Sequence, residues 1–192
     1  MAKELIVKEY PTIACCGLDC GLCPIYYTEG HSRCPGCYGP DFHNKHPSCS
    51  IITCCVKKHK FETCAECNEF PCSKIDIWDS YDSFISHRMS LSNLRLIKEK
   101  GIEQFFTQQQ KRTEFLKYML ENFNEGKSKS FFCIATALLQ IEDIEEALKE
   151  SFKKIEDDKI DSKNFKAKSK ILKEFLSKLA ENKSIDLKLK RK

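Results

Sequence analysis

The sequence lacks the features expected of a membrane protein, a repeat protein or a familiar enzyme. Its longest uncharged apolar stretch, residues 131–139, is too short to cross a bilayer, and the charged first residues do not resemble a secretory signal. It contains no internal repeat, no Ser, His and Asp in a triad-like order, and no paired carboxylates in a recognisable setting. We therefore expect a cytoplasmic protein with no membrane attachment and no general acid–base chemistry.

Proline and glycine are nearly missing from the second part of the chain. All six prolines and five of the seven glycines lie before Cys72, whereas Leu, Lys, Glu, Ile and Phe dominate beyond it. This shift predicts a cysteine-rich module over residues 1–74 and a helical domain over residues 75–192. Charge is also uneven. From Ile160 onward, eleven Lys and Arg stand against four Asp and Glu, so this basic C-terminal tail carries +7 and the remaining chain −3.

Twelve of the thirteen cysteines lie between Cys15 and Cys72. A segment this short, with few large apolar side chains, cannot close a hydrophobic core alone, so bonds to sulfur are needed to hold it together. In a reducing compartment such an array favours metal binding over disulfide bonds, and the odd number of cysteines argues against complete pairing in disulfides. The predicted fold is therefore a small, irregular, metal-stapled module with little regular structure, followed by an all-α helical bundle.

The spacing of the cysteines is typical of metal ligands. A CxxxCxxC group, a Cys-Pro-Gly-Cys knuckle, a mixed His-x-x-Cys pair and a CxxCx4C group follow one another, and imidazole binds zinc as readily as thiolate does. The candidate ligands are Cys16, Cys20, Cys23, Cys34, Cys37, His46, Cys49, Cys54, Cys64, Cys67 and Cys72.

Two adjacent cysteines need separate treatment. Neighbouring side chains on a regular element diverge, so of Cys54 and Cys55 we expect one to bind metal and the other to pack.

Spacing alone does not identify the metal. Four-cysteine zinc sites use two CxxC-like pairs, and the available ligands would fill two or three such sites. CxxxCxxC followed by proline also resembles the cysteine pattern of an iron–sulfur cluster. Radical-SAM enzymes share that motif, but their barrel needs about 200 residues or more, and this chain lacks alternating strands and helices. A thioredoxin-like role for Cys34 and Cys37 is disfavoured, because Gly39 and Pro40 follow where a helix must begin.

The ordered motifs CGLDCGLCP, CPGC, CSIITC and CAECNEFPC resemble a widespread prokaryotic family of small cysteine-rich proteins, catalogued as a domain of unknown function. The resemblance covers about Cys16 to Lys74. It implies a module that holds zinc, with no established reaction, and it implies the same ten cysteines as ligands. Where the family has a further cysteine, this chain has His46. Cys15 and Cys55 fall outside the pattern, which implies packing or free thiols.

Beyond Cys72, apolar residues recur at helical spacing. The predicted helices cover residues 80–100 (one or two helices), 102–124, 131–139, 143–154 with Asp143 as the cap, and 164–180. Cys133 lies on the apolar helix of residues 131–139. We interpret it as a small buried residue, with a reactive thiol or a distant metal ligand as the alternative.

Three functions remain open at this point. The favoured one is a non-catalytic zinc module that binds a protein or a nucleic acid, with the basic C-terminal tail as a candidate contact surface. The second is an iron–sulfur redox or electron-transfer protein. The third is a thiol-dependent enzyme that uses an activated zinc thiolate or Cys133 as nucleophile.

Overall fold

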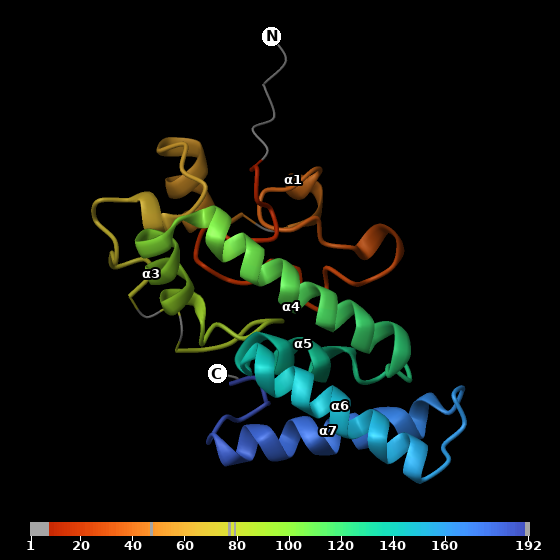
Figure 1. The fold of residues 1–192 in the computed structure, drawn as a ribbon. Helices are drawn as coiled ribbons and strands as arrows, with labels where there is room; N and C mark the ends of the chain where they lie inside the picture. The colour runs from red at the N-terminus through yellow and green to blue at the C-terminus, as the bar shows by residue number, and fades with distance from the viewer. Residues whose placement is uncertain (1–7, 47, 77, 79, 191–192) are drawn as a thin grey trace. The chain divides into compact units, whose positions relative to one another are not determined.

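The computed structural model describes residues 8–46, 48–76, 78 and 80–190, and all its regular elements are helical (Figure 1). The α-helices are α1 (Phe42–Lys45), α2 (Ser50–Ile52), α3 (Ser90–Lys100), α4 (Ile102–Asn122), α5 (Lys129–Leu138), α6 (Ile141–Asp157) and α7 (Phe165–Asn182). Short 3-10 turns are η1 (Cys20–Leu22), η2 (Gly30–Ser32) and η4 (Cys64–Glu66), and η3 (Thr53–Lys58) is a π-helical turn.

The predicted fold class is confirmed. Before Cys72, the described chain consists of short helical turns and irregular loops, and after it the long elements are helices. Within the described ranges no β-strand occurs, and Ile13 and Asp19 form an isolated antiparallel bridge. None of the described helices is long and apolar enough to cross a membrane.

The chain divides into two compact units. The first comprises the described residues up to Gln109 together with Lys190, and the second is Gln110–Leu189, so the division falls inside α4. This division describes compactness, whereas the predicted boundary at residue 74 separates a metal-binding module from a helical domain. That boundary stays a prediction.

The core of the first unit mixes cysteines with apolar side chains from helices. Ile13, Ile75 and Leu94 are fully buried, and α4 adds the buried ring of Phe105. Four cysteines belong to the same buried cluster. The cysteine-rich segment therefore obtains much of its apolar packing from residues that follow it in the chain.

The start of α3 holds the turn at Cys16 and Gly17. The Ser90 hydroxyl donates a hydrogen bond to the Cys16 carbonyl, and the Asn93 amide donates one to the Gly17 carbonyl at 2.9 Å. Gly17 has φ +81°, and a Cβ at this position would lie 2.3 Å from the Ser90 carbonyl oxygen and 2.7 Å from Leu94 Cγ. The close approach of this turn to α3 thus requires glycine.

Residues 80–89, which we predicted to be helical, instead form turns around Asp82. The carboxylate accepts hydrogen bonds from the His87 N–H at 2.7 Å, the Ser86 hydroxyl at 3.2 Å and the Lys190 N–H at 2.7 Å. This prediction is wrong because a short acidic side chain offers the backbone N–H groups an alternative to helical bonds. Burial alone would raise the pKa of Asp82, but these donors and the Arg88 guanidinium together lower it.

The remaining helices follow the predicted pattern closely. One detail differs: Gln140, and not Asp143, is the N-cap of α6, and the Asp143 carboxylate at the third helical position accepts from the Gln140 N–H at 3.1 Å. The same carboxylate pairs with Lys183 Nζ at 2.6 Å.

The second unit is built around α5. Phe132 and Ala135 on this helix are fully buried, as are Ile144 on α6 and Leu172 on α7. Arg112 donates to the carbonyl oxygen of Leu139 at 2.7 Å, which satisfies a group at the end of α5 that has no partner within the helix. Cys133 is buried within α5, as predicted.

Replacing Gly17 by alanine should destabilise the first unit far more than the same change at Gly30. Both glycines have positive φ, which costs a side chain about 1 kcal/mol, but nothing lies within 4 Å of a Cβ at Gly30. The clash at Gly17 adds the cost of overpacking, so we expect a loss of about 3 kcal/mol in the free energy of unfolding. Urea unfolding measures both variants, and equal losses would contradict the role given to α3.

Acid should weaken the wild type more than an Asp82→Asn variant. A lowered pKa means that Asp82 contributes stability above its unfolded pKa of about 3.9, and that this contribution is lost as pH falls through the folded value. The free energy of unfolding, measured in urea from about pH 6 to about pH 3, should therefore fall more steeply for the wild type. Asp76→Asn, at an exposed position of the same unit, is the control and should follow the wild type; parallel curves for Asp82→Asn would exclude this contribution.

Candidate metal centre

The backbone of residues 8–17, which we call the central segment, connects the cysteine-bearing loops. The Cys37 N–H donates to the Pro11 carbonyl at 2.7 Å, and the Cys64 N–H donates to the Cys15 carbonyl at 2.9 Å. Cysteines that are far apart in the sequence are thereby brought to one segment by main-chain hydrogen bonds.

The Cys-Pro-Gly-Cys knuckle packs tightly against this segment. Gly36 has φ +87°, and a Cβ there would lie 2.3 Å from the Pro11 carbonyl oxygen. That oxygen is the acceptor for the Cys37 N–H. Glycine at this position therefore serves the contact that fixes the Cys37 backbone.

A second part of the cysteine segment surrounds a small cavity, which we call the thiol cavity. Its volume is about 30 Å³, close to the space of a water molecule. It is bordered by Ile51, Cys54, Cys55, His59, Phe61, Cys64, Cys67, Phe70, Cys72, Lys74 and Ile75. Five cysteines therefore border one cavity, and four of them are predicted ligands.

The π-helical turn η3 explains why both adjacent cysteines border the thiol cavity. π-turns are wider than α-turns and are frequent at functional sites. Cys55 is buried and its thiol donates to the Phe61 carbonyl at 3.4 Å, whereas Cys54 is half-buried. Our expectation that one of the two binds metal and the other packs stays a prediction.

His59 also borders the cavity, although we did not predict it. Its ring stacks on Phe61, with ring centroids 5.5 Å apart and planes at 15°. Four residues separate His59 from Cys54 and four separate it from Cys64, a spacing that suits a metal ligand and that could have identified it from the sequence. In the structure it follows η3 directly.

We call four thiols of the first unit the thiol row: Cys37, Cys15 and Cys55 are buried in its core, and the half-buried Cys64 packs against that core. The sulfurs of Cys15 and Cys37 lie 3.7 Å apart, and the Cys15 N–H points at the Cys37 sulfur at 3.5 Å. The Cys37 thiol, which donates to the Cys15 sulfur at 3.7 Å, and the neighbouring Cys55 thiol lower the pKa of Cys15 to about 3, and Cys55 also lowers the pKa of Cys64. The same interactions raise the pKa values of Cys37 and Cys55.

A buried ammonium group accompanies the thiol row. The side chain of Lys8 is 1% exposed, donates to the Ile13 carbonyl, and lies 3.9 Å from a Glu62 carboxylate oxygen. Burial lowers the pKa of Lys8, but negative charge on Cys37, Cys15 and Glu62 outweighs it, so the pKa is raised overall. The ammonium in turn favours negative charge on Cys15, whose pKa is lowered, while the pKa of Cys37 is raised.

The CxxxCxxC group lies in a different setting. Burial raises the pKa of Cys16 to about 12 and also raises that of Cys20 well above its ordinary value. The Cys34 N–H donates to the Ile25 carbonyl at 3.2 Å, so the fold brings the first two motifs near each other. A cation bound here would favour the thiolates that burial disfavours.

The remaining candidates are His46 and Cys49. His46 is exposed and stacks on the Phe42 ring, with centroids 4.6 Å apart, and Cys49 is half-buried. Within the described ranges, no group of three or more Cys, His, Asp or Glu side chains stands in the geometry of a metal site. The eleven predicted ligands thus stay a prediction.

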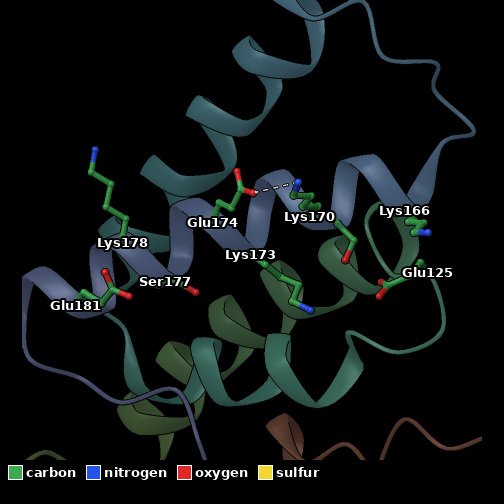
Figure 2. A pocket seen from close by; sticks show the side chains of 9 residues that line it. Glu125, Lys166, Lys170, Lys173, Glu174, Ser177, Lys178 and Glu181 are labelled. Atoms are coloured by element: carbon green, nitrogen blue, oxygen red, sulfur yellow. Dashed lines mark ion pairs between the residues drawn. The ribbon is translucent and has the colours of Figure 1, made fainter.

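The second unit has a groove along α7 with a volume of about 600 Å³ (Figure 2). Its sides are Glu125, Lys166, Ser169, Lys170, Lys173, Glu174, Ser177, Lys178 and Glu181. Lys170 pairs with Glu174 at 3.9 Å, and the ammonium of Lys173 lies 5.4 Å from the centre of the Phe131 ring. With four lysines and three glutamates, the groove carries both signs of charge, as exposed helix faces commonly do.

Comparison with known proteins adds a single match. No curated protein and no solved structure matches the chain. Residues 12–77 match the model of a family described as a protein of unknown function, DUF3795. The resemblance predicted from the cysteine motifs is thereby confirmed: over this segment, the chain is similar to an uncharacterised protein family.

Proposed function

We propose that the cysteine-rich segment is a metal-binding module and that its bound ions are structural zinc. The observation that carries this proposal is the thiol cavity, where Cys54, Cys64, Cys67 and Cys72 border one space of about 30 Å³. Sulfur ligands of this number and spacing suit tetrahedral zinc. Binding requires these side chains to turn toward the cavity, because they do not stand at ligand geometry without an ion.

The four predicted ligands at the thiol cavity match the number of sulfur ligands that a single zinc ion takes. The bound ion would neutralise the thiolates and cross-link η3 to the loop of residues 64–72. Each structural zinc contributes on the order of 10 kcal/mol to folding, which is enough to stabilise a segment with little core of its own.

The role we propose is non-catalytic, in a reducing compartment such as the cytoplasm. Reduced thiols are needed for zinc binding, and such thiols persist where glutathione and thioredoxin keep them so. The module would present a fixed surface for a macromolecular partner, and the basic C-terminal tail would contact an acidic one. The excess of eleven basic over four acidic residues beyond Ile160 supports this part of the proposal.

Protein purified without oxygen and without added metal should contain two or three zinc ions per chain and show no visible absorption band. Elemental analysis and an absorption spectrum measure both. Removal of zinc by a chelator should unfold the first unit, because the cysteine segment cannot form a core without bound metal. Circular dichroism measures this loss of structure. Bound iron with a broad visible band would contradict structural zinc and indicate an iron–sulfur cluster. A metal-free chain that stays folded would overturn the proposal.

Two serine substitutions sharpen this test. Cys67→Ser removes a half-buried thiol of the thiol cavity, and Cys133→Ser removes the buried thiol of α5. The first variant should lose zinc and stability toward chelator, while the second should keep its full zinc content. Equal zinc contents would remove the thiol cavity from the proposed sites.

Neutralising two lysines of the tail should weaken binding to a polyanion. We expect Lys188→Gln with Lys190→Gln to bind single-stranded RNA and heparin more weakly than the wild type, with a shallower dependence of affinity on salt. The backbone bonds of Lys190 to Asp82 do not involve the substituted side chain. Lys57→Gln with Lys58→Gln makes the same charge change at exposed positions in the first unit; an identical effect of both pairs would mean that net charge, and not the tail, attracts the polyanion.

A further inference from the structure

We propose that Cys15 and Cys55, which lie outside the family-like motifs, are metal ligands, and that the thiol row of Cys15, Cys37, Cys55 and Cys64 holds an ion of its own. This inference rests on the proposed function, because it concerns which thiols of the module bind metal. It adds a buried site to the thiol cavity and changes the role of two cysteines from packing to coordination.

The distance between two sulfurs is the first support. With zinc–sulfur bonds of about 2.3 Å in a tetrahedron, neighbouring sulfurs lie about 3.8 Å apart. The sulfurs of Cys15 and Cys37 are 3.7 Å apart. A disulfide would bring them to about 2.05 Å, so the pair stands at the separation of two ligands on one ion. Two thiols in simple contact reach the same separation, and the experiment below distinguishes these cases.

Main-chain groups fix the positions of several members of the row. The Cys15 N–H points at the Cys37 sulfur at 3.5 Å, and hydrogen bonds of this kind orient thiolate ligands and spread their charge. The Cys64 N–H is bound to the Cys15 carbonyl at 2.9 Å, so the backbone holds Cys64 beside Cys15 in any case. The fold thereby brings the backbones of three members of the row together, but among the described residues no three such side chains stand at ligand geometry, so binding requires the thiols to turn toward the ion.

The buried ammonium of Lys8 is the second, independent support. Its side chain is 1% exposed, and its nearest carboxylate oxygen, on Glu62, is 3.9 Å away. A charge so deeply buried is costly unless opposite charge surrounds it. Four thiolates on one divalent ion carry a net charge of about −2, and Lys8 would balance part of it. Neutral thiols in packing roles would give this ammonium much less electrostatic stabilisation.

Cys64 connects the two proposed sites. Its backbone N–H is bound to the Cys15 carbonyl of the row at 2.9 Å, and it borders the thiol cavity together with Cys55. A thiolate has enough lone pairs to bind two ions at once, so Cys64 would bridge the buried ion and the ion in the cavity. The module would then contain a pair of neighbouring ions and not two separate ones. Each thiol that binds releases its proton to solvent as the ion enters.

Cadmium-113 NMR of the wild-type chain tests the inference without a substitution. The zinc-free protein is loaded with 113Cd alone, and couplings between each 113Cd nucleus and cysteine Hβ protons identify the ligands of each ion. We expect one 113Cd to couple to Cys15, Cys37, Cys55 and Cys64, and a second to share Cys64. Couplings confined to the eleven predicted ligands would overturn the inference and leave the proposed function standing. A chain that binds no 113Cd would overturn both.

A matched pair of variants gives a second readout. Cys55→Ser should lose one of the bound ions, counted by elemental analysis, whereas Cys133→Ser keeps them all. Both substitutions replace a buried thiol by a hydroxyl, so they share the cost of burying a polar group. If Cys55→Ser retains the full metal content of the wild type, Cys55 is a packing residue and the proposed row is wrong.

Discussion

The main-chain hydrogen bonds of the central segment are the interaction on which the first unit depends. Loops rich in cysteine and poor in apolar residues bury too little apolar surface to associate by hydrophobic packing alone. The carbonyls of Pro11 and Cys15 give two of these loops fixed partners, at 2.7 and 2.9 Å. The turn at Gly17 adds the contact with α3, which supplies Leu94 to the core. The cysteines are thus arranged on a scaffold that backbone hydrogen bonds and a nearby helix maintain.

Much of the fold follows from periodicity in the sequence. The apolar stripes of α4, α5, α6 and α7 predict their positions to within a few residues, because each helix buries one face. The failure at residues 80–89 has a local cause. Asp82 binds the backbone N–H of His87, and that bond is decided by a side chain and not by the hydrophobic pattern.

The candidate site is less predictable than the fold. Spacing identifies pairs of cysteines within one motif, but it does not reveal which motifs meet, since that depends on loops whose path the sequence pattern does not specify. Cys55 and His59 reach the thiol cavity through a π-turn, and Cys15 meets Cys37 across 22 residues. Nothing in the sequence predicts the position of Lys8, because lysine side chains are ordinarily exposed. Its burial in the structure is what identifies it as part of the site.

The paired backbone contacts between Asp82 and Lys190 have a topological consequence. The Asp82 N–H donates to the Lys190 carbonyl at 2.9 Å, and the Lys190 N–H donates to the Asp82 carboxylate at 2.7 Å. The chain leaves the first unit after Gln109 and returns to it at Lys190, so the second unit is an insertion within the first. During synthesis on the ribosome, the cysteines emerge before the inserted helical unit. The unit that contains them can form its contact between Asp82 and Lys190 only after the entire inserted unit has been translated.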